Sequence, residues 1–208
     1  RRAEAADLLS ACRRFGVPLI VNDDVELAAT IGADGVHLGE HDGDIHAARS
    51  RLGPAAIIGV SCYDSLERAR QLAGAGADYL AFGAFFPSPT KPQARRAHAD
   101  LLRDAKALGL PLVAIGGITP DNAQPLIEAG ADFVAAISGV FASADPTACT
   151  TAKPNRVCAA RQPPSSSGST RSGVTPTACA AYAAGPRHRH RSRAAIPRPS
   201  APARRSPV

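Results

Sequence analysis

A short phrase that occurs three times constrains the fold more than any other feature of this sequence. Glycine, alanine and aspartate stand in that order at 32–34, 76–78 and 130–132. Each copy follows a stretch with helical periodicity and precedes a short apolar run. Glycine tolerates the left-handed conformation that ends a helix, and aspartate suits the tight turn that follows. The sequence therefore predicts that one kind of helix-to-strand joint is built three times.

Strands and helices alternate along the first 140 residues. Short apolar runs predict six strands, at 18–22, 35–38, 56–60, 79–82, 111–115 and 133–137. Helical spacing of apolar residues predicts helices at 1–15, 25–31, 45–52, 65–73, 99–108 and 120–129, with Ser65 and Thr119 as N-caps. This alternation is typical of a parallel sheet that is wound by right-handed crossovers.

Two parallel architectures fit this alternation, a closed barrel and a doubly wound sheet. We favour the barrel, because no GxGxxG motif opens the first unit and glycine recurs at the strand ends. A closed barrel of this kind has eight strands, whereas six are predicted. We therefore expect an α/β fold of the (βα)8 TIM-barrel type that is incomplete here, with about six βα units.

The charge distribution divides the chain into two parts. The net charge is +6, yet none of the 18 acidic residues follows Asp145, whereas 11 of the 24 Lys and Arg residues do. We predict a partial barrel at 1–147 and a disordered basic tail at 148–208, because a stretch of Ala, Pro, Arg and Ser buries too little apolar surface to fold. The sudden loss of acidic residues suggests that the tail arises from out-of-frame translation.

Composition also narrows the compartment and the partners. No apolar run is long enough to cross a membrane, and no secretory apolar segment opens the chain. The five cysteines are scattered without a CxxC pair, which favours a reducing compartment, so we expect a cytoplasmic protein without a membrane partner. The basic tail lacks interleaved aromatic residues, which argues against nucleic acid.

Polar or glycine residues follow each predicted strand, and in a barrel these positions lie on one rim. They are Asn22 and Asp23; Asp42; Ser61; Ser88, Thr90 and Lys91; Gly116 and Gly117; Ser138 and Gly139. Two carboxylates on neighbouring strands, Asp23 and Asp42, suit a Mg2+ ion that also takes phosphate oxygens. Lys91 supplies a point charge for a phosphate, and the glycine turns supply backbone N–H groups for another.

Each of these residues also has a purely structural interpretation. Asn22 and Asp23 fit a solvated turn, and Asp24 fits the N-cap of the following helix. Asp42 fits a solvated loop acid, Lys91 an ordinary surface lysine, and His37 a packed or rim histidine. The functional interpretation rests on the set, because each strand in turn ends in a residue that suits a phosphate or a metal.

Taken in order, these segments resemble the thiamine-phosphate synthase family. The resemblance is carried by 21–24, 35–39, 58–62, 88–91, 114–119 and 136–139, and it covers about residues 1–146. It implies a (βα)8 barrel and a Mg2+-dependent transferase of thiamine biosynthesis. Such an enzyme joins hydroxymethylpyrimidine diphosphate to thiazole phosphate and releases pyrophosphate.

The resemblance also implies a role for ten residues of this chain. Asp23 and Asp42 would bind Mg2+; Asn22, Ser61 and Lys91 the pyrimidine diphosphate; Ser88 and Thr90 the thiazole phosphate; Gly117, Ile137 and Ser138 its phosphate group. Lys91 and Ser61 would act catalytically on the departing diphosphate. No nucleophilic side chain is required.

The departures from the family pattern imply a second set of expectations. The family carries two earlier βα units and a Gln-x-Arg-x-Lys type motif that grips the pyrimidine diphosphate, and this sequence has no such motif. We therefore expect a truncated member with little or no activity. The alternatives are a thiazole tautomerase-like paralogue, which needs no metal pair, and a non-catalytic phosphate-binding barrel fragment. A homo-oligomer stays open.

Overall fold

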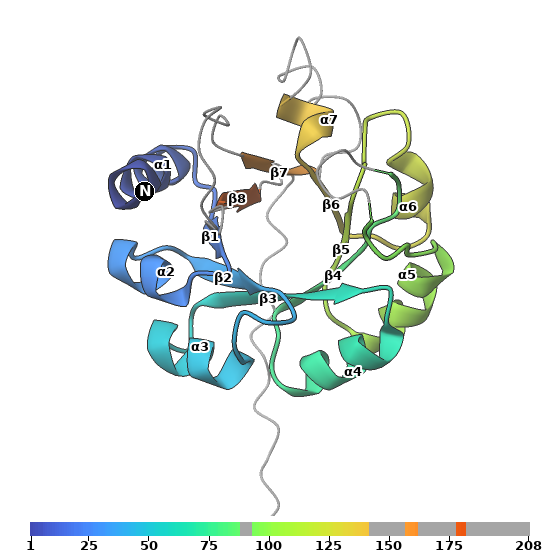
Figure 1. Ribbon diagram of the computed structural model, residues 1–208, viewed down its shortest axis with the longest axis horizontal. Helices are drawn as coiled ribbons and strands as arrows, with labels where there is room; N and C mark the ends of the chain where they lie inside the picture. Colours follow the sequence, from blue (N-terminus) through green and yellow to red (C-terminus); the bar gives the residue numbers. More distant parts are fainter. Residues whose placement is uncertain (88–92, 142–156, 162–177, 182–208) are drawn as a thin grey trace, which may run out of the picture.

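A computed structural model describes residues 1–87, 93–141, 157–161 and 178–181. Strands and helices alternate from the first helix onward, and Figure 1 shows the strands as a ring with the helices outside it. The elements are α1 (Arg2–Arg14), β1 (Leu19–Asn22), α2 (Val25–Ile31), β2 (Gly35–Leu38), α3 (Ile45–Leu52), β3 (Ile57–Tyr63), α4 (Leu66–Gly74), β4 (Tyr79–Phe82), α5 (Asp100–Ala105), the 3-10 helix η1 (Lys106–Leu108), β5 (Leu112–Ile115), α6 (Gln124–Glu128), β6 (Phe133–Ala136), α7 (Ser138–Phe141), β7 (Val157–Arg161) and β8 (Ala178–Ala181).

The sheet is a closed barrel in the described part of the chain. Strands β1 to β6 pair in sequence order and all run parallel, which confirms the predicted α/β barrel with six βα units and excludes the doubly wound sheet. Strand β7 pairs parallel with β6, and β8 pairs antiparallel with both β7 and β1. The last two strands therefore close the ring with a different hydrogen-bond pattern from the first six.

Strands β7 and β8 lie in the stretch 148–208, which was expected to be a disordered tail. The remainder of that stretch lies outside the described residues. An open six-stranded sheet leaves unpaired N–H and C=O groups along its first and last strands. The short sequences Val-Cys-Ala-Ala-Arg and Ala-Cys-Ala-Ala place backbone against those two edges. The sequence gave no sign of these strands because their runs of Ala and Cys lie in a stretch without a clear apolar pattern.

The two faces of the sheet bury different side chains, because successive strand residues point to opposite sides. The outer face packs under the helices in one large cluster, with fully buried members on each strand from β2 to β6, among them Val36, Ile58, Leu80, Leu112 and Val134. The inner face carries a smaller cluster of Ala81, Val113 and Ala135, against which Tyr79 and Phe133 pack. The barrel interior is therefore packed with side chains rather than hollow.

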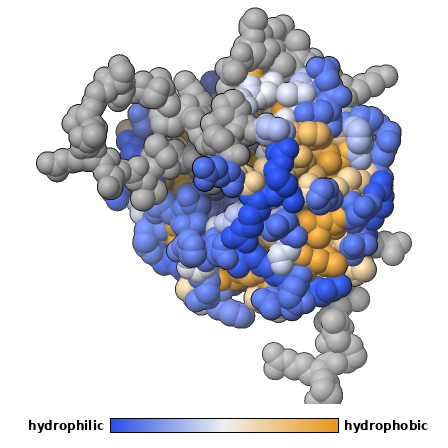
Figure 2. Space-filling view, turned by 45° about the vertical axis from the view of Figure 1, so that its right-hand side comes forward, coloured by the Kyte–Doolittle hydropathy of each residue, from blue (hydrophilic) through white to orange (hydrophobic). Residues whose placement is uncertain are grey.

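The outer surface is mixed in character. Figure 2 shows a hydrophobic area bordered by hydrophilic side chains on the face of the molecule that it presents. Within the described residues, no helix combines the length and the apolar character that a bilayer crossing requires.

The three Gly-Ala-Asp phrases form the same joint at the amino ends of alternate strands. In each joint the aspartate N–H donates to the carbonyl of one residue on the preceding strand, and the aspartate carboxylate accepts from the N–H of that same residue. The pairs are Asp34 with Leu19 (3.0 and 2.7 Å), Asp78 with Ile58 (2.8 and 2.8 Å) and Asp132 with Leu112 (2.8 and 2.9 Å). The prediction of one joint built three times is confirmed, and the carboxylate supplies the reason for the aspartate.

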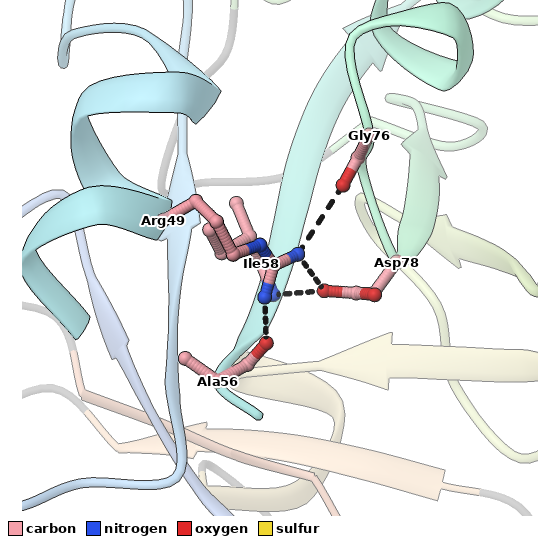
Figure 3. Close-up of polar contacts among 5 residues, drawn as sticks. All are labelled: Arg49, Ala56, Ile58, Gly76 and Asp78. Atoms are coloured by element: carbon pink, nitrogen blue, oxygen red, sulfur yellow. Dashed lines mark hydrogen bonds and ion pairs between the residues drawn. The ribbon is translucent and has the colours of Figure 1, made fainter. Parts of the chain in front are cut away.

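A basic side chain from the helical segment before the first strand of each pair completes each joint. Arg49 on α3 donates to the carbonyls of Ala56 and Gly76 and to the carboxylate of Asp78 at 2.6 Å, as Figure 3 shows. Arg13 on α1 donates to the Gly32 carbonyl at the first joint, and Lys106 of η1 bonds the Asp132 carboxylate at the third. The bonds to Gly32 and Gly76 satisfy carbonyls that helix ends leave free.

One predicted helix boundary differs from the structure. The helix expected at 120–129 begins only at Gln124, and Thr119 is not its N-cap. Instead the Asn122 side chain accepts from the Thr119 N–H at 2.8 Å, which holds 119–122 in a turn. A side chain that bonds nearby backbone competes with helix formation in this way.

Candidate active site

The carboxyl ends of β1 to β6 meet at one mouth of the barrel, which is where the sequence predicted the site. The structure describes seven of the ten predicted site residues: Asn22, Asp23, Asp42, Ser61, Gly117, Ile137 and Ser138. Ser88, Thr90 and Lys91 lie outside the described residues, so their roles stay predictions.

The end of β1 turns sharply at Asp23. Its backbone has a positive φ of 65°, an uncommon conformation for a residue with a side chain. Its N–H donates to the carbonyl of His37 on β2 at 2.8 Å. The next residue, Asp24, accepts from the Leu27 N–H at 2.8 Å and so caps α2, which confirms its structural interpretation. Asp23 is therefore held at the carboxyl end of β2 by its backbone.

Asp42 is anchored at the same end of β2. Its carboxylate accepts from the Gly39 N–H at 2.9 Å, which folds the loop after β2 back on itself. The side chain is partly buried rather than freely solvated. Asp23 is bonded to His37 and Asp42 to Gly39, two residues further along, so both acids are fixed to one short segment of the rim.

The carboxylates of Asp23 and Asp42 suit a hard cation only if phosphate oxygens complete its coordination. No group of three or more His, Cys, Asp or Glu side chains that could hold a metal by themselves occurs among the described residues. Mg2+ typically takes one or two carboxylates and fills its other positions with water and phosphate oxygens. Asp23 and Asp42 fit that pattern.

A chain of three polar side chains crosses the barrel interior below the mouth. The ring of His37 lies between the hydroxyls of Tyr79 and Ser61, with Nδ1 2.9 Å from the Tyr79 Oη and Nε2 2.9 Å from the Ser61 Oγ. The His37 and Tyr79 rings stack with centroids 5.5 Å apart and planes 20° apart. Burial lowers the pKa of His37 to about 4, against a smaller opposing effect of the Asp42 carboxylate. The imidazole is therefore neutral at pH 7.

Gly59 makes this chain of side chains sterically feasible. The residues Asn22, His37, Gly59 and Tyr79 stand in register on four neighbouring strands. A Cβ at position 59 would lie only 1.8 Å from the Cζ of Tyr79. The tyrosine ring therefore occupies the space of the missing side chain, and only this arrangement lets it cross β3 to reach His37.

A second aromatic residue links the loops after β2 and β4. Tyr63 ends β3 with a positive φ of 54°, and its hydroxyl accepts from the Glu40 N–H at 3.2 Å. The Arg95 guanidinium lies 4.6 Å from the centre of its ring and bonds the Glu40 carboxylate at 2.6 Å, which lowers the pKa of that carboxyl. Arg68 lies 5.9 Å from the same ring. Tyr63 thus braces the loop that carries Asp42.

The turn after β5 is built for close backbone approach. Gly116 and Gly117 both have positive φ, and a Cβ on Gly117 would meet the carbonyl oxygen of Pro87 at 2.4 Å. Asn122 donates to the Gly117 carbonyl at 3.1 Å and so holds the turn from below. This turn therefore packs directly against the residues that lead into 88–92.

Ile137 and Ser138 begin the segment after β6. A Cβ on Gly139 would lie 2.2 Å from the Ile118 carbonyl oxygen, so this segment packs closely on the turn after β5. The Val140 N–H bonds the Ile137 carbonyl at 3.2 Å within the first turn of α7. Gly117, Ile137 and Ser138 are thus brought to one side of the mouth, as the sequence predicted.

Sequence reasoning missed the residues that support the site. His37 was interpreted only as a packed or rim histidine, and Tyr79, Tyr63, Arg95 and Asn122 were not singled out. Asn122 had a readable signal, since an Asn three residues after a Thr at a turn fits a side-chain-to-backbone bond. The His37–Tyr79 contact had none, because it joins residues 42 positions apart.

Comparison with known proteins agrees with this architecture. A family described as thiamine monophosphate synthase matches residues 1–140. The thiamine-phosphate synthase of Xanthomonas campestris pv. campestris (strain 8004) is 62% identical over 148 residues, which are 71% of this chain and 72% of that protein. The thiamine-phosphate synthase of Methylobacillus flagellatus is 62% identical over 142 residues, 68% of each chain. The solved thiamine phosphate pyrophosphorylase of Pyrococcus furiosus superposes with a TM-score of 0.66 at 36% identity, over 72% of this chain and 71% of that one. The chain belongs to the thiamine monophosphate synthase family.

Proposed function

We propose that this barrel joins hydroxymethylpyrimidine diphosphate to thiazole phosphate at its mouth, forming thiamine phosphate and pyrophosphate. The thiazole nitrogen forms a bond to the pyrimidine methylene carbon, and the bond from that carbon to the diphosphate oxygen breaks. The observation that carries the proposal is the anchoring of Asp23 and Asp42 to the same end of β2. The names of the relatives support it.

Asp23 and Asp42 are the proposed Mg2+ ligands. Two carboxylates held on one segment repel each other unless a cation neutralises them. Bound Mg2+ would supply charge neutralisation for the diphosphate as it departs. The bond from the Asp23 N–H to the His37 carbonyl holds the backbone of one acid, and the bond from the Gly39 N–H holds the carboxylate of Asp42.

The leaving-group side of the mouth is polar. Ser61 lies on the inner face of β3, and Asn22 lies at the end of β1. Both side chains offer hydrogen-bond donors to phosphate oxygens. We propose that they hold the pyrimidine diphosphate, together with Lys91. These groups stabilise the negative charge that grows on the diphosphate, and no side chain needs to attack the substrate.

The opposite side is proposed to hold the thiazole phosphate. We propose that backbone N–H groups around Gly117 and Ser138 donate to the phosphate oxygens. Glycine is required at 117 because a Cβ there would meet the Pro87 carbonyl oxygen at 2.4 Å. Ile137 lies beside Ser138, and the turn rests against the residues leading to Ser88 and Thr90. Rigid packing of this turn would hold the thiazole nitrogen in line with the pyrimidine carbon.

The compartment is the remaining part of the proposal. Cys12 and Cys62 are free and buried, and burial raises the pKa of the Cys62 thiol to about 12. Inert thiols of this kind suit the reducing cytoplasm, where we propose that the protein works.

The test is product formation by the full chain with both substrates, read as thiochrome fluorescence of thiamine phosphate, with and without Mg2+. Asp42→Asn should lower kcat/KM by about 100-fold or more. The matched control is Asp44→Asn, two residues away, where Asn still caps α3 and activity should be retained. Product formation that is insensitive to metal removal would contradict the proposed role of Mg2+, and absence of product with both substrates would favour the tautomerase-like paralogue.

A further inference from the structure

The three side chains inside the barrel form a directed chain of hydrogen bonds. Tyr79, His37 and Ser61 come from β4, β2 and β3, and each of the two contacts measures 2.9 Å. The rings of Tyr79 and His37 stack, and the Tyr79 hydroxyl makes the polar contact with the imidazole. The direction in which the protons point decides what Ser61 can offer to a ligand.

A neutral imidazole carries one N–H, so two arrangements exist. In the first, the Tyr79 hydroxyl donates to Nδ1 of His37, and the N–H at Nε2 donates to the Ser61 oxygen. The serine proton is then free to donate toward the mouth. In the second, the N–H at Nδ1 of His37 donates to the Tyr79 oxygen, and the Ser61 hydroxyl donates to Nε2. Only lone pairs of the serine oxygen then face the mouth.

The chemistry of the ligand selects between these arrangements. Phosphate oxygens of a metal-bound diphosphate accept hydrogen bonds, so a serine that presents only lone pairs would repel them. A serine that accepts from His37 and donates to the phosphate is further polarised by the chain behind it. The first arrangement therefore fits a site for a departing diphosphate.

We propose that Tyr79 and His37 are positioning residues that hold the Ser61 hydroxyl as a hydrogen-bond donor to a phosphate oxygen at the barrel mouth. The proposal rests on the proposed function for the identity of the anion. Its geometric part, the run of contacts from Tyr79 through His37 to Ser61, stands on the two 2.9 Å distances, and the direction of the bonds follows from the anion. Gly59 is part of the same arrangement, because the ring of Tyr79 occupies the space that a side chain at position 59 would fill.

The first test needs no substrate. Long-range proton–nitrogen NMR correlation spectra of the 15N-labelled full chain report which imidazole nitrogen carries the proton, and His37→Gln assigns the signals of His37. We expect the Nε2–H tautomer in the wild type, a mixture in Tyr79→Phe, and no change in the matched control Tyr63→Phe. An Nδ1–H tautomer in the wild type, or an unchanged tautomer in Tyr79→Phe, would overturn the proposal.

The second test is a double-mutant cycle on affinity for inorganic pyrophosphate with Mg2+, measured by calorimetry. Ser61→Ala should weaken binding by about 10- to 100-fold, and Tyr79→Phe by about 3- to 10-fold. In the Ser61→Ala background, Tyr79→Phe should have no further effect. Equal losses in both backgrounds would show a merely structural role and overturn the proposal, as would absence of pyrophosphate binding by the wild type. If both tests succeed and no thiamine phosphate forms, only the proposed function fails.

Discussion

Replacing Gly59 by alanine should destabilise the barrel, because the added methyl group would overlap the ring of Tyr79. The new Cβ would lie 1.8 Å from Cζ, 2.2 Å from Cε1 and 2.3 Å from Oη of Tyr79. Ordinary contact begins near 3.4 Å, so the ring would have to withdraw by about 1.6 Å. A movement of that size breaks the 2.9 Å hydrogen bond to His37 and the stacking of the two rings.

The size of the effect follows from three contributions. Overpacking of a filled interior costs about 1–3 kcal/mol. Loss of the Tyr79–His37 hydrogen bond adds about 1 kcal/mol. Alanine restricts the unfolded chain more than glycine does, which offsets about 0.5–1 kcal/mol. We therefore expect Gly59→Ala to lower the free energy of unfolding by about 1–3.5 kcal/mol.

Urea unfolding followed by circular dichroism measures this change. The matched control is Gly74→Ala at the end of α4, where a Cβ would meet nothing within 4 Å. Alanine favours the helix there, so the control should be neutral or stabilising by up to about 1 kcal/mol. If Gly59→Ala unfolds within about 0.5 kcal/mol of the wild type, then Tyr79 is not held in the barrel interior and the reasoning fails.

Three further predictions concern the joint, the glycine turn and the buried histidine. Asp78→Ala removes the carboxylate acceptor of Ile58 and Arg49 and should cost about 2 kcal/mol in urea unfolding, whereas an equally stable variant would contradict the role of the joint. Asn122→Ala removes the bonds that hold the turn at Gly117, so it should raise the KM for thiazole phosphate several-fold and lower the free energy of unfolding by about 1–2 kcal/mol. An unchanged KM would show that the turn does not contribute to binding. Because burial depresses the pKa of His37 to about 4, the unfolded state binds more protons between pH 6.5 and 4, so stability should fall by up to about 3 kcal/mol as pH falls through that window. The difference between the wild type and His37→Gln across that window measures this contribution, and parallel pH profiles would refute it.

The fold was largely readable from the sequence because each joint is local. The phrase Gly-Ala-Asp marks a helix end, a turn and a strand start within five residues, and all three copies form the expected joint. The order of β1 to β6 then follows from right-handed crossovers. The late start of α6 could not be read, because the bond from Asn122 to Thr119 competes with a good N-cap sequence.

The candidate site was readable only in part. Asp23, which follows β1, and Ser61, which lies near the end of β3, were found because strand ends are visible in the sequence, although β3 continues to Tyr63 beyond its predicted end at 60. The supporting contacts of His37 and Tyr63 depend on strand register and on which face each residue occupies. A shift of one residue in register would reverse those faces, and sequence alone does not determine the register. The strands that close the ring were missed because their pairing is with distant edges.

The three aspartate joints have a consequence for how such a barrel can be assembled. Each joint ties one strand to the strand that follows it, β1 to β2, β3 to β4 and β5 to β6. Within the described residues, no aspartate side chain makes the corresponding bonds between β2 and β3 or between β4 and β5. The chain is thus a series of two-strand blocks, each secured within itself at the end opposite the mouth. Gain or loss of a whole block through gene duplication or deletion would leave every remaining joint intact, whereas a break inside a block would open one.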